Sequence, residues 1–296
     1  MSPTLKQLEV FYGELNQHVA HVYVRLPNDQ SGIELRGMVS GPFSEYSKTL
    51  PTRIPLQSLP PTETLLARGI ATDPCYWDGM TASRYRVDVE LVRNGEVVES
   101  TTREIGLRQL LARGRSLRRD GKRWVLRACR VALPATDMLE TCREKLAALC
   151  TAAPSDELCT AASLQGVTLV VEVSEDDADK LRQRLFQLSK FPAIACVIVD
   201  GQAVLKDTAG SFKSAAPNLL YAHRPLDSER IGEWADVVAV DRATTERMIE
   251  FSKRCTKPFF AVDIVDEPTD LLARRAACDN LQRQLVKAGD FAGYIA

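Results

Sequence analysis

The stretch Thr101–Val131, TTREIGLRQLLARGRSLRRDGKRWVLRACRV, decides how the rest of the chain is interpreted. It opens on an alternating segment that ends at Ile105-Gly106, continues through a basic link, and closes in an apolar run that begins at Trp124. Between the link and that run stands Asp120-Gly121, which predicts a two-residue hairpin because both central residues of a type I′ turn need a positive φ. The hydrophobic pattern changes across this stretch. We therefore interpret it as a domain junction, with the boundary between Gly106 and Lys122.

Before the junction, short alternating segments are separated by turn residues. Alternation with period 2 is typical of strands that bury one face, and about seven such strands in about a hundred residues indicate an immunoglobulin-like β-sandwich. Asn94-Gly95 predicts a second hairpin turn. Six of the expected strands are Val22–Leu26, Ile33–Val39, Arg53–Leu56, Thr64–Ile70, Arg84–Val92 and Val97–Ile105. We predict a sandwich over residues 1–110, followed by a hairpin link over 111–123.

After the junction, continuous apolar runs alternate with amphipathic segments. Runs of this kind predict a parallel sheet that helices cover on both faces. The apolar runs are Trp124–Val131, Leu146–Cys150, Val167–Val173, Ile194–Val199, Leu219–Ala222, Val237–Val240, Phe259–Val265 and Phe291–Ile295. The segments between them with a helical pattern are Asp137–Leu146, Ser155–Leu164, Glu175–Ser189, Thr244–Cys255 and Thr269–Lys287. Eight strands is the number that closes a TIM-like barrel, so we predict a minimal (β/α) barrel over residues 124–296.

A doubly wound open sheet is the alternative to the barrel. Such sheets commonly carry a Gly-x-Gly-x-x-Gly or Walker loop after a strand, and none follows any apolar run here. The barrel is also short, since TIM barrels have about 200 residues or more. We therefore expect short loops at the strand ends and a shallow face with little to hold a substrate.

Composition narrows the class of protein. The 296 residues carry a formal net charge of −1, so we expect no nucleic-acid partner and no membrane partner. The arginines that crowd the junction are interpreted as a solvated hairpin face rather than an anion site. Eight cysteines without a Cys-x-x-Cys pair, and three histidines, do not indicate a zinc site, and we expect no cofactor. The N-terminus has no apolar signal region and no run is long enough to span a bilayer, which together predict a cytoplasmic protein.

Three elements of the junction carry a resemblance to a known family. Ile105-Gly106-Leu107-Arg108, Asp120-Gly121-Lys122 and Leu126-Arg127-Ala128 follow one another in the chain. They resemble the Gly-Phe-Arg, Asn-Gly-Lys and Leu-Arg-Gly elements of family 2 glycoside hydrolases, the β-galactosidase and β-glucuronidase group. There, an immunoglobulin-like sandwich passes into the first strand of a TIM barrel. Upstream, Tyr76-Trp77 and Arg84–Val87 are similar to the family's approach to the same strand. The expected sandwich begins near residue 5, so we expect no counterpart of the family's N-terminal jelly-roll domain.

The resemblance implies positions for the family's two catalytic glutamates. The acid/base follows strand four, and counting from Phe191–Ile194 puts Gln202 in its place. The nucleophile follows a Lys-Pro strand, and counting from Lys257-Pro258 puts Asp263 there. Among the family's polar set, Glu172 is kept. An amide cannot protonate a leaving oxygen, and a carboxyl displaced by about 1 Å loses most of its effect. The inherited catalytic pair is therefore expected to be lost.

Acidic residues nevertheless gather where barrel strands are expected to end. They could bind a divalent cation or form a new acid/base pair, or they could cap helices and loops. The acids are Glu172, Asp200, Asp241 and Asp263, with Asp266 and Glu267 beyond them. The sequence leaves the metal question open. Glu172 lies in an apolar strand, so we expect a cation or an arginine such as Arg127 or Arg130 to hold it. His223 is expected to be structural.

Three functions fit these observations. The first is a glycoside hydrolase-like protein that has lost catalysis and binds a carbohydrate or a protein partner. The second is an active glycosidase that uses a relocated acidic pair at the barrel mouth, and the third is a structural module of a larger assembly. The first is the hypothesis that we carry forward, and it predicts a protein that is not an enzyme.

Overall fold

The computed structural model describes residues 5–27, 32–60, 64–200, 211–225, 231–242, 253, 255–263 and 270–296. The chain divides into two compact units. One consists of Met1–Arg108 with Lys190–Pro192, and the other of Gln109–Ser189 with Ala193–Ala296. Each unit has its own hydrophobic core.

In the part of the chain that the structure describes, no helix has the length and apolar character needed to cross a membrane.

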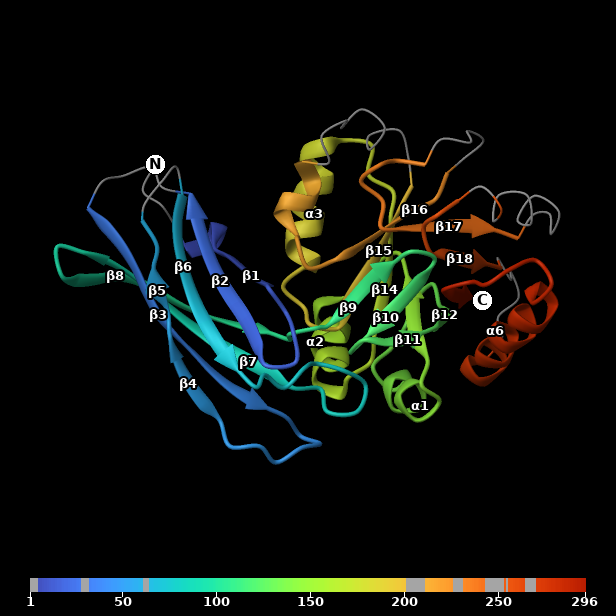
Figure 1. Cartoon of the computed structure of the whole chain (residues 1–296), viewed down its shortest axis with the longest axis horizontal. Coiled ribbons are helices and arrows are strands. Elements are labelled where there is room, and N and C mark those ends of the chain that lie inside the picture. The colour runs from blue at the N-terminus through green and yellow to red at the C-terminus, as the bar shows by residue number, and fades with distance from the viewer. Residues whose placement is uncertain are drawn as a thin grey trace. The chain divides into compact units, whose positions relative to one another are not determined.

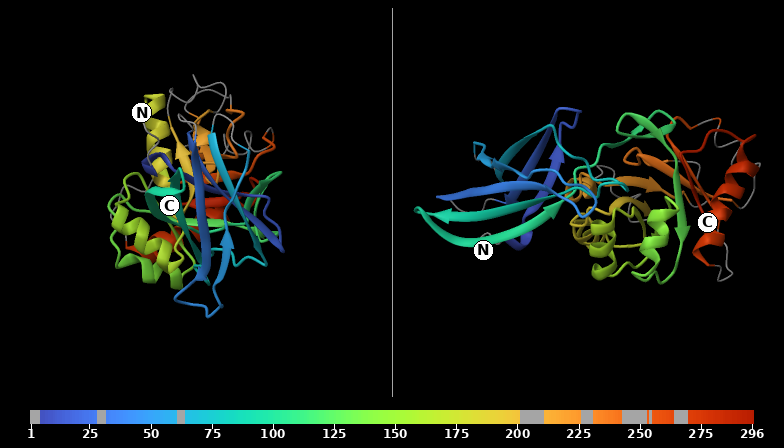
Figure 2. Two further views of the ribbon diagram at one scale, coloured as in Figure 1. Left: turned by 90° about the vertical axis from the view of Figure 1, so that its left-hand side faces the viewer. Right: turned by 90° about the horizontal axis from the view of Figure 1, so that it is seen from below.

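The first unit is a β-sandwich of two antiparallel sheets (Figures 1 and 2). Among the described residues, one sheet has the strand order β1-β2-β6-β5 and the other β4-β3-β7-β8. The strands are β1 (Glu9–Gly13), β2 (Val19–Pro27), β3 (Ile33–Phe43), β4 (Thr52–Pro55), β5 (Gln57–Ser58), β6 (Thr64–Thr72), β7 (Arg84–Arg93) and β8 (Glu96–Ile105). Strand β7 shows why these segments form a sandwich, because Tyr85, Val87, Val89 and Leu91 are buried at every second position. The predicted sandwich is confirmed.

Both predicted hairpin turns are present. Asn94 and Gly95 have φ values of 52° and 87°, and Asp120 and Gly121 have 51° and 74°. Positive φ at both central residues is the type I′ geometry that the Asn-Gly and Asp-Gly pairs predict.

The basic link forms more structure than one hairpin. In the described chain it is a three-stranded antiparallel sheet of order β11-β10-β9. Its strands are β9 (Leu110–Arg113), β10 (Ser116–Arg119) and β11 (Lys122–Trp124). Leu117 lies across from Ala112 on one side and Trp124 on the other. These three residues pack against the apolar cluster inside the barrel. The Arg119 Nη2 donates to Thr168 Oγ1 at 3.4 Å, just before a barrel strand begins. The link therefore closes the N-terminal end of the barrel.

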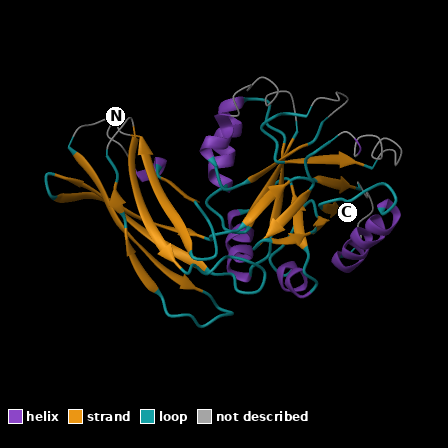
Figure 3. Cartoon of the chain, in the orientation of Figure 1, coloured by secondary structure: helices purple, strands orange, loops and turns teal. Residues whose placement is uncertain are grey.

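The second unit is a closed barrel. Within the described residues eight strands pair in parallel, and the last strand joins the first, which excludes the open-sheet alternative. The strands are β12 (Leu126–Arg130), β13 (Ala148–Thr151), β14 (Leu169–Val173), β15 (Ile194–Val199), β16 (Leu220–His223), β17 (Val237–Asp241), β18 (Phe259–Val262) and β19 (Gly293–Ile295). Outside the ring lie the described helices α1 (Met138–Glu144), α2 (Asp156–Gln165), α3 (Ala178–Leu188) and α6 (Leu271–Leu285) (Figures 1 and 3). The predicted small TIM-like barrel is confirmed.

Local signals fix where the barrel helices begin. The side chains of Ser155, Asp177 and Asp270 accept hydrogen bonds from backbone N–H groups in the first turns of α2, α3 and α6. Short polar side chains at this position satisfy N–H groups that have no partner within the helix. Helix α2 ends at Gly166, whose φ of 76° is the left-handed conformation that glycine adopts easily. The loops from β13 to α2 and from β14 to α3 are short.

The interior of the barrel is filled by alternate residues of the strands. Phe260 is fully buried, and a Cβ on Gly293 would lie 2.6 Å from its ring and 2.9 Å from the Leu126 Cβ. The last strand therefore needs a glycine at this point, since any larger residue would displace its neighbours. The cluster inside the barrel consists of Leu117, Leu126, Ala128, Ala148, Cys150, Val170, Cys196, Ile198, Ala222, Val237, Ala239, Phe260, Val262, Ala292 and Ile295.

Candidate functional site

The interior becomes charged at the C-terminal end of the barrel. Side chains alternate along a strand, so the position two residues after an interior residue also points inward. The positions that follow Ala128, Val170, Ile198, Ala222 and Ala239 in this way are Arg130, Glu172, Asp200, Arg224 and Asp241. Two of these lie just outside their strands but continue the ladder, since the Asp200 N–H donates to the Val173 carbonyl at 3.0 Å and the Arg224 N–H to the Val199 carbonyl at 3.3 Å.

Arg224 is the centre of this charged layer. Its Nη2 donates to Glu172 Oε1 at 2.9 Å, and its Nη1 donates to Asp200 Oδ2 at 3.2 Å. Its Nε lies 3.4 Å from Asp241 Oδ1, an ion pair without a hydrogen bond. The Arg224 side chain is 11% exposed. One guanidinium thus contacts carboxylates from three different strand ends.

Glu172 has a second arginine partner. The Arg130 Nε donates to Glu172 Oε2 at 3.1 Å, and the Arg130 Nη2 lies 3.0 Å from the same oxygen. The Glu172 side chain is 9% exposed, so both of its oxygens are held in a water-poor environment. The prediction that an arginine holds Glu172 is confirmed for Arg130. It is wrong for Arg127. This residue is next to the inward-facing Ala128 on β12, so its side chain points outward, where it pairs with Asp279 of α6.

The charged layer shifts the pKa of its members. Burial raises the pKa of Asp200, and the Glu172 and Asp241 carboxylates add to this effect, while Arg224 opposes it. Burial alone would lower the pKa of Arg224, but Asp200, Asp241 and Glu172 outweigh it and raise that pKa. Arg224 therefore stays charged, and Asp200 is harder to ionise than an aspartate in water.

Two carboxylate oxygens of the layer accept no hydrogen bond. They are Asp200 Oδ1 and Asp241 Oδ1, and both atoms are buried. Buried polar atoms in proteins are nearly always hydrogen-bonded, so a pair of unsatisfied acceptors in one place is a specific feature of this barrel mouth. The Arg224 Nε, 3.4 Å from Asp241 Oδ1, likewise makes no hydrogen bond.

Asp263 is separate from the Arg224 cluster. Its carboxylate Oδ2 accepts a hydrogen bond from the Arg242 Nη1 at 2.7 Å, and its N–H donates to the Ile295 carbonyl at 2.8 Å. Asp263 comes directly after Val262, which belongs to the cluster inside the barrel. Side chains alternate along a strand, so Asp263 is on the same side of the chain as Phe259 and Ala261, which pack in a separate apolar cluster. The structure thus brings together Glu172, Asp200 and Asp241, and pairs Asp263 elsewhere. Gln202, Asp266 and Glu267 lie outside the described residues.

No group of three or more histidine, cysteine, aspartate or glutamate side chains in the described ranges is placed to hold a metal ion. His223 is buried, and its Nδ1 accepts the Gly232 N–H at 3.1 Å. Burial and the nearby Lys257 lower the pKa of His223, and the Nδ1 that accepts the Gly232 N–H carries no proton.

Arg224 and Arg242 are the residues that sequence reasoning misses. Each follows directly on the end of a strand, after His223 and Asp241 respectively. The signal in the sequence that could have identified them is their position directly after a strand. A basic residue at a strand end beside several acids predicts an ion-paired layer, whereas acids considered alone suggest a cation or acid/base site.

Several solved structures are similar to this chain. A β-glucuronidase from Ruminococcus gnavus in complex with an N1-substituted uronic isofagomine aligns with a TM-score of 0.65 and 12% identity, over 100% of this chain and 61% of that one. A Bifidobacterium dentium β-glucuronidase complexed with coumarin-3-O-glucuronide aligns with a TM-score of 0.64 and 12% identity, over 97% and 59%. A Parabacteroides merdae β-glucuronidase with glycerol in its active site aligns with a TM-score of 0.64 and 13% identity, over 99% and 47%.

The fold is that of the β-glucuronidases. The sandwich-and-barrel plan that the junction residues imply is therefore confirmed, and the chain is glycoside hydrolase-like in its fold. It spans about half the length of these enzymes, from 47% to 61% in the three alignments above. No protein-family model and no curated protein matches the sequence. The likeness thus concerns the fold, and the chemistry of the mouth is argued from this chain's own residues.

Proposed function

We propose that this chain is a glycoside hydrolase-like protein that binds a carbohydrate with a carboxylate group at its barrel mouth and does not cleave it. The observation that carries the proposal is the Arg224 guanidinium in contact with Glu172, Asp200 and Asp241.

Hydrolysis with retention needs two carboxyl groups about 5 Å apart, one free to attack and one able to exchange a proton. The inward-facing carboxylates here are occupied by Arg224, and Glu172 is bonded to Arg130 as well. A carboxylate oxygen that accepts a hydrogen bond from an arginine is less free to attack a substrate or to take up a proton. The charged layer is therefore suited to holding a ligand rather than to acid/base work.

The class of ligand is inferred from the charges at the mouth. The Arg130 side chain is 33% exposed, so it can reach a ligand with its planar guanidinium. Arginine recognises carboxylates in pairs of parallel hydrogen bonds. Ligands of the similar enzymes include a glucuronide and a uronic isofagomine, which supports an acidic sugar.

The test has two arms. Nitrophenyl β-glucuronide, β-galactoside and β-mannoside are incubated with the chain, and we expect no release of nitrophenol above the buffer rate. Glucuronate and glucose are titrated in a calorimeter, and we expect binding of glucuronate alone, weakened about tenfold or more in Arg130→Gln. Arg182→Gln is the matched control, because Arg182 pairs with Asp179 on the exposed surface of α3. Equal binding of both sugars, or none, contradicts the proposed ligand.

An active glycosidase remains the second candidate, and one observation favours it. Asp200 follows strand four of the barrel and Asp263 follows strand seven, the strands after which the family resemblance places its two catalytic carboxyls. Burial raises the pKa of Asp200, as a general acid requires. Saturable turnover that disappears in both Asp200→Asn and Asp263→Asn would establish this function in place of the one proposed.

A further inference from the structure

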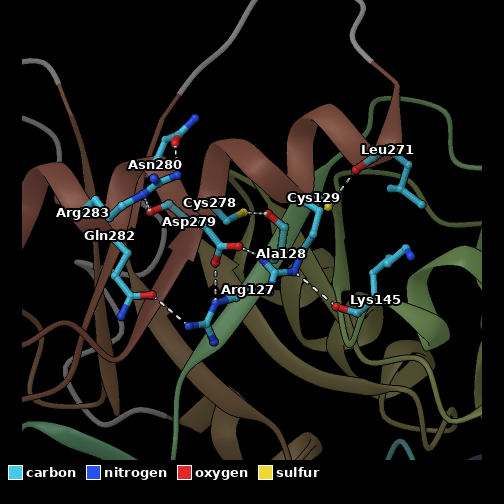
Figure 4. Close-up of polar contacts among 11 residues, drawn as sticks. Arg127, Ala128, Cys129, Lys145, Leu271, Cys278, Asp279, Asn280, Gln282 and Arg283 are labelled. Carbon is cyan, nitrogen blue, oxygen red and sulfur yellow. Dashed lines mark hydrogen bonds and ion pairs between the residues drawn. The ribbon is translucent and has the colours of Figure 1, made fainter.

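The outer side of strand β12 carries a polar seam with helix α6 (Figure 4). The Arg127 Nε donates to Asp279 Oδ1 at 3.0 Å, and its Nη2 donates to Gln282 Oε1 at 2.8 Å. The Arg275 Nη1 lies 2.7 Å from Asp279 Oδ2, and the Arg275 Nε donates to the Lys145 carbonyl at 3.3 Å. These contacts fix the position of the helix along the strand.

Two free thiols lie beneath this seam. Cys129 comes from β12 and Cys278 from α6, and both residues are fully buried. The Cys278 thiol donates to the carbonyl of Ala128, the neighbour of Cys129, at 3.4 Å. The Cys129 thiol donates to the Leu271 carbonyl in the first turn of α6 at 3.7 Å. Each cysteine is thus held against the element that carries the other (Figure 4).

We propose that Cys129 and Cys278 are a redox-sensitive pair, which a low-molecular-weight disulfide converts into a disulfide bond that ties α6 to β12. Cytosolic disulfides of mesophilic organisms are usually transient and catalytic or redox-sensing. A reversible bond between Cys129 and Cys278 would belong to this class.

The electrostatics of the pair support an order of attack. The contact with Cys129 and the nearby Arg275 lower the pKa of Cys278, whereas the contact with Cys278 and burial raise the pKa of Cys129. Cys278 therefore supplies the thiolate, which is the nucleophilic form. It attacks one sulfur of the small disulfide, forms a mixed disulfide and releases one small thiol. Cys129 then loses its proton, attacks the Cys278 sulfur and releases the second small thiol. The protein loses two hydrogen atoms, and the small disulfide is reduced to two thiols.

Cys142 is the competing partner. It lies on α1, close enough to contribute to the raised pKa of Cys129. Burial raises the pKa of Cys142 to about 12, and the pKa of Cys129 is raised as well, so a pair of these two thiols lacks the thiolate that begins the exchange. A cross-link between Cys129 and Cys278 is therefore favoured over one between Cys129 and Cys142.

The cross-link would join two parts of the barrel that are far apart in sequence. Helix α6 leads into β19, and β19 pairs with β12 to close the ring. The bond would therefore strengthen the closing seam of the barrel and restrict the unfolded chain over a long loop. Because both thiols are buried, the reaction requires α6 to open locally, and its rate would report that opening.

The experiment uses the full chain under native conditions with 2-hydroxyethyl disulfide as the oxidant. After free thiols are blocked, intact mass and peptide mapping without reductant are expected to show the loss of two hydrogens and a peptide pair joined through Cys129 and Cys278. The melting temperature should rise by several degrees and return to its first value with dithiothreitol. Cys129→Ala and Cys278→Ala should abolish both changes. Cys142→Ala and Cys159→Ala, which also remove buried thiols, should retain them.

Two results would overturn the proposal. One is a chain whose Cys129 and Cys278 stay reduced, or carry only separate mixed disulfides, while the more exposed Cys75 reacts. The other is a cross-link between Cys129 and Cys142. Both results are obtained from peptide maps of the unmodified sequence, so they do not depend on any variant folding.

Discussion

The two ends of the barrel interior are built from the same strands and differ in chemistry. At the N-terminal end, Leu126 and Phe260 are buried in an apolar cluster together with Leu117 of the three-stranded link. At the C-terminal end, Arg224 and Glu172 occupy the corresponding inward positions and are held by ion pairs. An apolar layer is stabilised by burial itself, whereas a charged layer is costly to bury and persists through its partners. In TIM barrels the first kind of end serves stability and the second serves function, so the difference marks the mouth as the functional end.

Removing a large side chain from the apolar end should have the largest effect. Phe260 is fully buried inside the ring, and Phe260→Ala should lower the free energy of unfolding by about 3–5 kcal/mol because it leaves a cavity. Denaturant unfolding measures this. Leu272→Ala is the control, since Leu272 is 52% exposed and its loss should change stability by about 0.5 kcal/mol or less. Similar values for the two variants would contradict the packing assigned to the barrel interior.

At the charged end, Arg224→Met should lower the free energy of unfolding by about 2–4 kcal/mol, because it leaves Glu172 and two further carboxylates without their shared partner. Arg242→Met is the matched control. Its pair with Asp263 is 39% and 23% exposed, and its loss should cost about 1 kcal/mol or less. An Arg224 variant as stable as the control would mean that the acids are solvated rather than held.

Glu172→Gln should have a smaller effect than Arg224→Met, because Arg224 keeps its contacts with Asp200 and Asp241. We expect a loss of about 1–2 kcal/mol, or several degrees of melting temperature at about 2–4 °C per kcal/mol. Scanning calorimetry beside Glu34→Gln, whose carboxylate is 62% exposed, provides the comparison. No change in melting temperature would show that the mouth does not bury Glu172.

The smallest expected effect is a difference in pH dependence between Asp200 and Asp279. Burial raises the pKa of Asp200 above 3.8. Burial would also raise that of Asp279, but Arg275 and Arg127 outweigh it and hold the pKa below 3.8. A raised pKa gives stability at low pH that is lost as pH rises through the folded-state value, and a depressed pKa gives stability that is lost as pH falls through it.

Stability relative to wild type should therefore change in opposite directions in the two aspartate variants. As pH rises from below to above 3.8, Asp200→Asn should gain relative to wild type, and Asp279→Asn should lose, by a small amount because the Asp279 side chain is 46% exposed. Unfolding curves at a series of pH values measure both. A parallel change in the two variants would contradict the assigned environments.

The fold could be predicted from the sequence to a large extent, for a physical reason. Parallel strands buried on both faces must be apolar throughout, and runs such as Val167–Val173 coincide with barrel strands such as β14. Strand β1 is not among the strands that the sequence predicts. Strands β9 and β10 fall largely in the predicted link, because arginines interrupt their pattern.

The candidate site could be predicted in part. Glu172, Asp200 and Asp241 were placed together correctly because strand ends meet at one face of a barrel. Asp263 pairs with Arg242 rather than Arg224. It comes one residue after the inward Val262, and a shift of one residue along a strand turns the side chain to the other face. Arg224 could not be assigned as the shared partner, because which guanidinium reaches which acid depends on the three-dimensional arrangement of strands far apart in sequence.

The central claim is that the mouth acids are held by Arg224, and a double-mutant cycle of Arg224→Met and Glu172→Gln tests it most directly. Denaturant unfolding of wild type, both single variants and the double variant gives the coupling free energy of the pair. With Nη2 and Oε1 2.9 Å apart and both side chains nearly buried, we expect a favourable coupling of about 1.5 kcal/mol or more. Effects that add to within about 0.3 kcal/mol would show two independent side chains, and would contradict the ion-paired mouth on which the proposed function rests.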